Sequence, residues 1–329
     1  MKATLYKKLT NQTIQCIACN RRCIISPQQT GYCRMRSNQN NELILSNIPS
    51  SIAVDPIEKK PLYHFLPASK SYSIGTYGCN FKCKFCQNHE ISQPQDCSRS
   101  LSQFKSLSSD VAVHSAIKNG CRSISYTYNE PTIFSEYAHS IGIHARKNGL
   151  HNIFVTNGYA TNECWDYLSS FIDAANIDLK GNRKFYKELC GGVDYEKVLS
   201  SISYAKSKGI WIEITTLIIP GLNEDVKEIE EFICSVDHKM PWHLTAFFPR
   251  YQMKDIQCTN ARTLERIKDS LSKRLEYVYC GNVLSKHQNT YCPKCNELLI
   301  KRNGFKVALN SILKNACPKC KYTISGVFE

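Results

Sequence analysis

The sequence of 329 residues lacks long hydrophobic runs, low-complexity tracts and repeats of a fixed period. It contains no stretch of about 18 apolar residues, and a transmembrane helix needs about 20. The first residues, MKATLYKKLTNQTIQ, also lack the apolar segment of a secretory signal peptide. We therefore expect a cytoplasmic protein without a membrane segment. Its length allows one large α/β domain with small appendages.

Acidic residues are scarce beside basic ones, with 28 Asp and Glu against 42 Lys and Arg, which gives a formal net charge of +14. Metal-bound thiolates would offset part of this charge. The remaining excess suits an anionic substrate or partner, but a solvated lysine-rich surface is the simpler explanation. Charge alone therefore gives no reason to expect nucleic acid as a partner.

Cysteine, by contrast, is abundant, with 18 residues. In a reducing compartment such cysteines are more often metal ligands than disulfide partners. Eleven of them fall in three tight groups, and most of the scattered others are predicted to be small buried residues. The groups are Cys16, Cys19, Cys23 and Cys33; Cys79, Cys83 and Cys86; and Cys292, Cys295, Cys317 and Cys320. The composition thus predicts a metalloprotein.

Short β-rich runs alternate with amphipathic helical patterns from residue 71 to about 283. Helical periodicity is clear over 133–149 and 262–275. Strands are predicted over residues 71–76, 123–128, 152–157, 175–179, 211–219, 242–248 and 277–281. Strand–helix alternation predicts a parallel sheet, and about 210 residues are too few for a closed eight-stranded barrel of about 250. We expect an α/β fold, a partial (β/α)6-type TIM barrel.

Three regions follow from this pattern. Residues 1–69 form a Cys-rich N-terminal segment with a proline-rich connector, 70–284 the partial barrel, and 285–329 a small C-terminal module. In such barrels the active site lies at the carboxyl ends of the strands. The three-cysteine group begins directly after the first predicted strand, where chemistry is expected.

The three-cysteine group lies in GCNFKCKFCQN (78–88) and has the spacing C-x3-C-x2-C. Closed zinc sites and most iron–sulfur sites use four protein ligands, so three thiolates leave one metal position for a substrate or cofactor. Gly78 and Asn80 suit the sharp turns that aim three sulfurs at one centre. A zinc site completed by His89 or Cys97 is the alternative that spacing leaves open.

This loop and its surroundings resemble the radical S-adenosylmethionine (SAM) enzymes. The stretch KKPLYHFLPASKSYSIGTYGCNFKCKFCQNHEISQ is most similar to the radical SAM member of the AmmeMemoRadiSam system, a group related to the activating enzymes of pyruvate formate-lyase. The segments YTYNEPT, VTNGYAT and NIDLKG extend the resemblance. It implies a [4Fe–4S] cluster on Cys79, Cys83 and Cys86, whose fourth iron binds SAM. Reductive cleavage of SAM then yields a 5′-deoxyadenosyl radical that abstracts hydrogen from a substrate.

The resemblance also implies a set of SAM contacts. Asn129 and Glu130 match the segment that binds the SAM ammonium, although the glycines of the family pattern are replaced. Each candidate has an ordinary structural alternative: a helix cap, a strand-end turn, a surface ion pair, a core histidine or loop packing. The remaining candidates are Phe85 near the adenine, Thr156 and Asn157 near the ribose, Asp178 and Lys180 with the lysine near the carboxylate, and His243 near the ribose or carboxylate.

The two outer cysteine groups predict separate metal sites. The C-terminal sequence CPKC occurs twice, with 21 residues between, which is typical of a zinc ribbon. Asn296 and Lys321 follow the two pairs, where glycine is frequent, and would need left-handed backbone. Rubredoxin-type iron is the alternative. The N-terminal group, spaced C-x2-C-x3-C-x9-C, predicts either zinc or a second iron–sulfur cluster.

Together these features predict a radical SAM enzyme whose substrate, small molecule or protein, is unidentified. A low-potential electron donor is implied as a partner, and the resemblance adds Memo-like and Ammecr-like proteins. A glycyl-radical enzyme activase is the alternative within this class. A zinc-binding adaptor or nucleic-acid-binding module is the alternative of another class, but it leaves the central cysteine loop unexplained.

Overall fold

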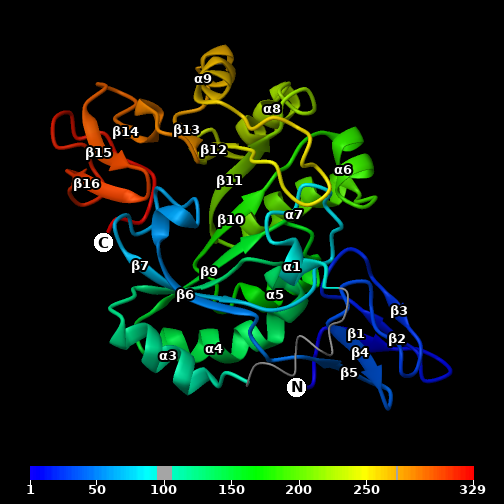
Figure 1. Ribbon diagram of the computed structural model, residues 1–329. Helices are drawn as coiled ribbons and strands as arrows, with labels where there is room; N and C mark the ends of the chain where they lie inside the picture. The colour runs from blue at the N-terminus through cyan, green and yellow to red at the C-terminus, as the bar shows by residue number, and fades with distance from the viewer. Residues whose placement is uncertain (95–105, 272) are drawn as a thin grey trace.

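A computed structural model describes residues 1–94, 106–271 and 273–329. Its centre is one curved sheet in the order β13-β12-β11-β10-β9-β8-β7-β6 (Figure 1). Neighbouring strands from β7 to β13 run parallel. These strands are β7 (Lys70–Gly75), β8 (Ser123–Tyr126), β9 (His151–Thr156), β10 (Ala174–Asp178), β11 (Trp211–Ile218), β12 (Trp242–Ala246) and β13 (Val278–Gly281). All seven predicted strands are confirmed.

An additional strand, β6 (Ser51–Pro56), pairs antiparallel with β7. From its proline-rich sequence this stretch is expected to be part of the connector, so β6 differs from the expectation. Because β6 and β13 lie at opposite ends of the strand order, the barrel is open, as expected for a partial barrel.

The larger helices follow the strands and lie around the outside of the sheet (Figure 1). Side-chain oxygens of Ser108, Thr161 and Asn182 cap three of them by accepting from backbone N–H groups. The helix predicted over 262–275 is shorter, because Leu271 has an extended backbone. The helices are α3 (Ser109–Lys118), α4 (Ser135–Lys147), α5 (Asn162–Leu168), α6 (Arg183–Leu189), α7 (Tyr195–Ser207), α8 (Lys227–Asp237) and α9 (Ala261–Ser270). Within the described ranges, none of the helices combines the length and apolarity that a membrane span needs.

The N-terminal segment packs beside α4. Its strands are β1 (Tyr6–Lys8), β2 (Ile14–Cys16) and β3 (Ile24–Ile25) in one sheet, and β4 (Arg36–Gln39) with β5 (Glu42–Leu45) in a hairpin. Arg36 and Glu136 form a buried ion pair between β4 and α4. Glu136 Oε1 also accepts from the backbone of Thr4 and Leu5 at 3.1 and 3.0 Å. Since both charges are satisfied, this contact fixes the segment to the barrel.

Residues 57–66 cross the amino ends of the parallel strands, and we call them the floor strap. Glu213, near the start of β11, accepts hydrogen bonds from the backbone of Tyr63 and His64 at 2.9 and 2.8 Å. Arg302 of the C-terminal module donates to the Tyr63 carbonyl at 2.8 Å and lies 4.1 Å from the Tyr63 ring centroid. The floor strap thus closes one end of the barrel and holds the C-terminal module.

The C-terminal module contains β14 (Thr290–Tyr291), β15 (Leu298–Asn303) and β16 (Lys306–Asn310), paired antiparallel. The short elements that complete the described chain are η1 (Ile57–Lys59), α1 (His89–Ser92), η2 (Pro131–Phe134) and η3 (Lys286–Gln288).

Candidate active site

A cavity of about 470 Å³ opens at the carboxyl ends of the parallel strands. This is the end at which barrel enzymes place their reacting groups. Of the residues predicted for the central cluster and SAM, all but His243 line it: Cys79, Cys83, Phe85, Cys86, Asn129, Glu130, Thr156, Asn157, Asp178 and Lys180. Residues from four segments far apart in sequence therefore line one cavity.

The loop after β7 carries the three cysteines. Gly78 has a φ of +83°, and a Cβ there would lie 2.2 Å from the Cys33 carbonyl oxygen, so only glycine fits. Cys79 Sγ accepts from the Phe81 N–H at 3.3 Å and lies 3.9 Å from Asn157 Nδ2. Burial raises the pKa of the Cys79 thiol, so a thiolate there needs a cation beside it.

The distances between the three sulfur atoms indicate whether they could share one zinc ion. A tetrahedral zinc ion, with Zn–S bonds of about 2.3 Å, brings its sulfurs to about 3.8 Å from one another. Among the described residues, Cys79, Cys83 and Cys86 do not reach mutual distances within 4.8 Å, and His89 does not complete a compact group with them. His89 stacks on Tyr251 instead, with ring centroids 4.6 Å apart. The three cysteines and His89 therefore do not have the compact arrangement of a zinc site, and Cys97 lies outside the described residues.

Glu130 is buried at the end of β8 and lines the cavity. Its Oε1 accepts from Thr132 N–H at 3.0 Å and from Thr156 Oγ1 at 2.7 Å, and its Oε2 accepts from Asn157 N–H at 2.7 Å. The predicted cap and the predicted cavity position are therefore both present. A carboxylate offers about four acceptor positions, so one remains for an ammonium. Burial raises the pKa of Glu130, and a bound cation would counter this effect.

Asn129 lines the cavity but uses its amide to hold the cysteine loop. Its Nδ2 donates to Thr76 Oγ1 at 3.0 Å and to the Gly78 carbonyl at 2.9 Å, while its Oδ1 accepts from Thr76 N–H at 3.1 Å. The preceding Tyr128 has a left-handed backbone with a φ of +72°. Such strain in a non-glycine residue is typical of functional sites. The geometry therefore gives Asn129 a positioning role.

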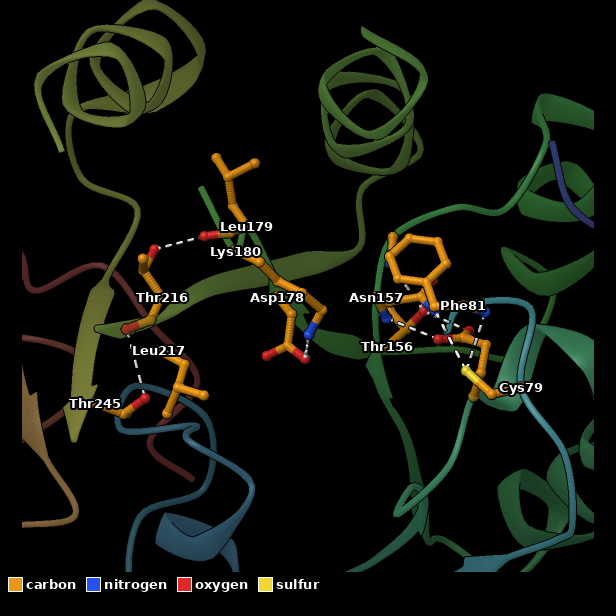
Figure 2. A network of polar contacts seen from close by, with 12 residues as sticks. Cys79, Phe81, Thr156, Asn157, Asp178, Leu179, Lys180, Thr216, Leu217 and Thr245 are labelled. Carbon is orange, nitrogen blue, oxygen red and sulfur yellow. Dashed lines mark hydrogen bonds and ion pairs between the residues drawn. The ribbon is translucent and has the colours of Figure 1, made fainter. Parts of the chain in front are cut away.

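Asp178 and Lys180 form an ion pair on the opposite side of the cavity, 2.6 Å between Nζ and Oδ2 (Figure 2). Burial alone would lower the pKa of Lys180, but the Asp178 carboxylate, together with the nearby thiols of Cys83 and Cys190 and the hydroxyl of Tyr186, outweighs burial and raises the pKa above its usual value. The ammonium lies 5.9 Å from the centroid of the Phe85 ring, which packs on Phe185. This side of the cavity thus presents a fixed positive charge beside an apolar ring.

His243, the remaining candidate for a SAM contact, is not among the residues that line the cavity. It lies near the start of β12, is 1% exposed, and its Nε2 is 2.7 Å from Glu213 Oε2. Tyr63 and Tyr279 pack against its ring. Thr245, two residues further along the same face of the strand, lines the cavity instead. His243 is a satisfied core histidine one layer below the site.

Two residues near the site were not singled out from the sequence. Lys60 of the floor strap lines the cavity and pairs with Asp55 at 2.6 Å. Cys190, buried after α6, hydrogen-bonds the Cys83 thiol, and this bond together with burial raises the pKa of Cys83. Nothing in the local sequence marks either residue, because each reaches the site from a segment distant along the chain.

The C-terminal cysteines form a compact group. The Sγ atoms of Cys292 and Cys320 are 3.5 Å apart, those of Cys295 and Cys317 are 3.7 Å apart, and all four lie within 4.8 Å of one another. Asn296 and Lys321 take left-handed φ values of 57° and 60°. The turns expected of a zinc ribbon are therefore made without glycine. These distances match a tetrahedral zinc site.

Known proteins resemble this chain at several levels. The Radical SAM superfamily model matches residues 73–233, which include the cysteine loop and the ends of β8, β9 and β10. An uncharacterized protein of Methanocaldococcus jannaschii is 39% identical over 317 residues, covering 94% of this chain and 93% of the relative. Another protein of that organism, provisionally named as a glycyl-radical enzyme activating enzyme, is 25% identical over 238 residues, covering 70% of this chain and 88% of the relative.

A solved structure shares the fold. Streptococcus suis SuiB bound to S-adenosylmethionine superposes with a TM-score of 0.50 at 16% identity, over 70% of this chain and 53% of SuiB. This chain therefore spans about half the length of SuiB, and at this identity the likeness concerns the fold alone.

Proposed function

Because the chain belongs to the radical SAM superfamily, we propose that it is an enzyme that holds a [4Fe–4S] cluster on Cys79, Cys83 and Cys86 and binds SAM in the adjacent cavity. Bound there, these groups supply reductive cleavage of SAM and abstraction of a hydrogen atom from a substrate. The observation that carries the proposal is the meeting of three openly spaced sulfurs with a buried carboxylate and a fixed ammonium around one cavity.

The charges of the cavity match the two charged ends of an amino acid. Glu130 offers a carboxylate lone pair to the SAM ammonium, and Lys180 offers its ammonium to the SAM carboxylate. Asp178 keeps Lys180 charged and in place at 2.6 Å. Phe85 provides an apolar face of the kind that packs on an adenine. Thr156 already donates to Glu130, so its first role is to orient that carboxylate.

The substrate is the open part of the proposal. Two relatives from Methanocaldococcus jannaschii are provisionally named as glycyl-radical enzyme activating enzymes, at 25% and 24% identity. These names favour a glycine residue of a partner protein as a candidate substrate. A low-potential electron donor would be a further partner. Memo-like and Ammecr-like partners remain a prediction from the sequence resemblance. Incubation with a glycyl-radical enzyme tests this candidate: absence of a glycyl radical in the EPR spectrum, while 5′-deoxyadenosine forms, would set it aside.

The compact C-terminal group is proposed to hold zinc in a structural role. All four ligands come from the protein, and the sulfur distances of 3.5 and 3.7 Å leave no open position. Loss of this metal is expected to affect folding of the module and not the chemistry of the cavity.

The main test is anaerobic. The chain is reconstituted with iron and sulfide, reduced with dithionite in the presence of SAM, and assayed for 5′-deoxyadenosine. Wild type is expected to form this product and Cys83→Ala is not. Cys258→Ala, a change at an exposed cysteine outside the cavity, is the matched control and is expected to retain activity. A cluster-loaded wild type that binds SAM but never cleaves it contradicts the proposal.

A further inference from the structure

The four N-terminal cysteines surround a space of their own. Cys16 ends β2, Cys19 and Cys23 lie in the turn before β3, and Cys33 precedes β4. All four line a small void together with Arg36, Ile133 and Asn80. Three of the cysteines are buried and Cys23 is half-buried. Scattered structural cysteines would have no reason to share one void.

The spacing of the four sulfurs distinguishes two kinds of metal group. Zinc lies about 2.3 Å from its thiolates, so sulfurs that share one zinc ion come to about 3.8 Å from one another. The compact C-terminal group shows what zinc spacing looks like in this chain. In the described part of the chain, the N-terminal sulfurs do not reach that spacing.

The central cysteines provide the second comparison. They too exceed the spacing of the C-terminal group, and the proposed function assigns them a [4Fe–4S] cluster. The N-terminal group thus resembles the cluster site and differs from the zinc site. Four cysteines are the usual ligand set of a complete [4Fe–4S] cluster.

Asn80 adds an independent observation that points to a ligand. It is fully buried and lines the void, and its Oδ1 accepts from Asn157 Nδ2 at 2.7 Å. Its Nδ2 makes no full hydrogen bond with the described residues but faces the Cys19 sulfur. A donor in this position stabilises the thiolate, which is the form of cysteine that binds a metal.

We propose that Cys16, Cys19, Cys23 and Cys33 hold a second [4Fe–4S] cluster, complete in its protein ligands. The comparison with the central cysteines rests on the proposed function, whereas the void and Asn80 do not. Arg36 lies beside the void with its charge already paired to Glu136. Arg21 also lines the void and donates to the Asn80 carbonyl at 3.0 Å, which places a positive charge near the anionic cluster.

Metal analysis of the whole chain tests this proposal without any variant. After anaerobic reconstitution, two clusters and one zinc site predict about eight iron atoms, about eight sulfides and about one zinc per chain. Zinc in the N-terminal group predicts about four iron atoms and about two zinc atoms. The proposal is overturned if the chain holds about four iron atoms and about two zinc atoms. It is also overturned if the N-terminal group adds about two iron atoms or fewer to those of the central site.

Variants of the cysteines show which of the two groups holds the iron. The triple change Cys79→Ala, Cys83→Ala and Cys86→Ala is expected to keep about four iron atoms and the absorption of a [4Fe–4S] cluster. Cys16→Ser with Cys33→Ser is expected to remove the other half of the iron, and Cys121→Ser, at a buried cysteine outside the group, to remove none. A triple variant that is folded by circular dichroism yet free of iron contradicts the second cluster. A wild type that holds iron only in the N-terminal group would instead contradict the proposed function.

Discussion

Asn157 Nδ2 donates a hydrogen bond to Asn80 Oδ1 over 2.7 Å and so joins the end of β9 to the cysteine loop after β7. The backbone N–H of Asn157 donates to Glu130 at the same distance, which adds the end of β8. One residue therefore connects the loop that carries the cysteines with the carboxylate that faces the cavity. Hydrogen bonds within the protein therefore fix the cysteine loop and the Glu130 carboxylate relative to each other.

Replacing Glu130 by glutamine should weaken SAM binding and leave the central cluster in place. The amide keeps the size of the side chain and one acceptor oxygen, but it removes the charge that faces the ammonium. Hydrogen bonds to charged groups contribute about 1.5–3 kcal/mol, so we expect a loss of affinity of about 10- to 100-fold. Equilibrium dialysis with SAM and iron analysis measure the two properties. Glu163→Gln, in a half-exposed pair with Arg22, is the control; unchanged affinity of E130Q would remove Glu130 from the site.

Replacing Gly78 by alanine should displace the cysteine loop. The added Cβ would lie 2.2 Å from the Cys33 carbonyl, which is backbone and cannot move aside alone. We expect loss of most of the iron bound at the central site, measured after anaerobic reconstitution. Gly120→Ala is the matched control, because Gly120 also has a positive φ, +66°, but has open space around its Cβ position. That control should cost only about 1 kcal/mol of stability, and equal iron loss in both variants would show that strain alone is responsible.

Replacing Cys317, one of the four proposed zinc ligands, should release one metal ion and loosen the C-terminal module. Structural zinc contributes directly to the folding of small modules. Cys317→Ser is therefore expected to lose about one zinc atom per chain and to become sensitive to proteases within residues 285–329. The iron content should stay at the wild-type level, because the barrel is held by other contacts. Equal loss of zinc and iron would contradict the separate sites.

The floor strap predicts a pH dependence of stability. Burial lowers the pKa of His64 to about 4 from an ordinary value of 6.5. Between these two values the unfolded chain binds a proton that the folded chain does not, so stability falls as the pH falls from 6.5 towards 4. The shift corresponds to about 3 kcal/mol at most. Urea unfolding of metal-loaded wild type and His64→Gln at pH 7 and pH 5 measures it: wild type should lose more stability than the variant, and parallel losses would refute the assignment.

The barrel could be predicted from the sequence because its signals are local. Each parallel strand is a short run rich in residues that favour strands, such as that of β9, and helical periodicity separates the runs. The polar residues that end those strands also meet in one place, because the carboxyl ends of parallel strands share one edge of the sheet. Asp178 and Lys180 are assigned from the family resemblance, and their place at the end of β10 is consistent with that assignment.

The sequence does not predict how deep within the barrel a given side chain of a strand lies. His243 and Thr245 lie on the same face of β12, and the sequence does not show that one belongs to the core and the other to the cavity. Glu213, which decides the position of His243, lies 30 residues away. The antiparallel strand β6 and the floor strap were missed for a related reason, since their proline-rich sequence is typical of a connector and their partners are distant.

The closed end of the barrel has a kinetic consequence. The floor strap lies at the amino ends of the strands, and the cavity, as the described residues line it, opens at their carboxyl ends. A molecule that reacts near Cys79 is therefore expected to enter from that end. SAM, which needs the inner position beside the cysteines, would therefore have to enter before a bulky substrate covers the entrance. Turnover would follow a compulsory order of addition and release, which initial-rate kinetics would reveal as an ordered pattern.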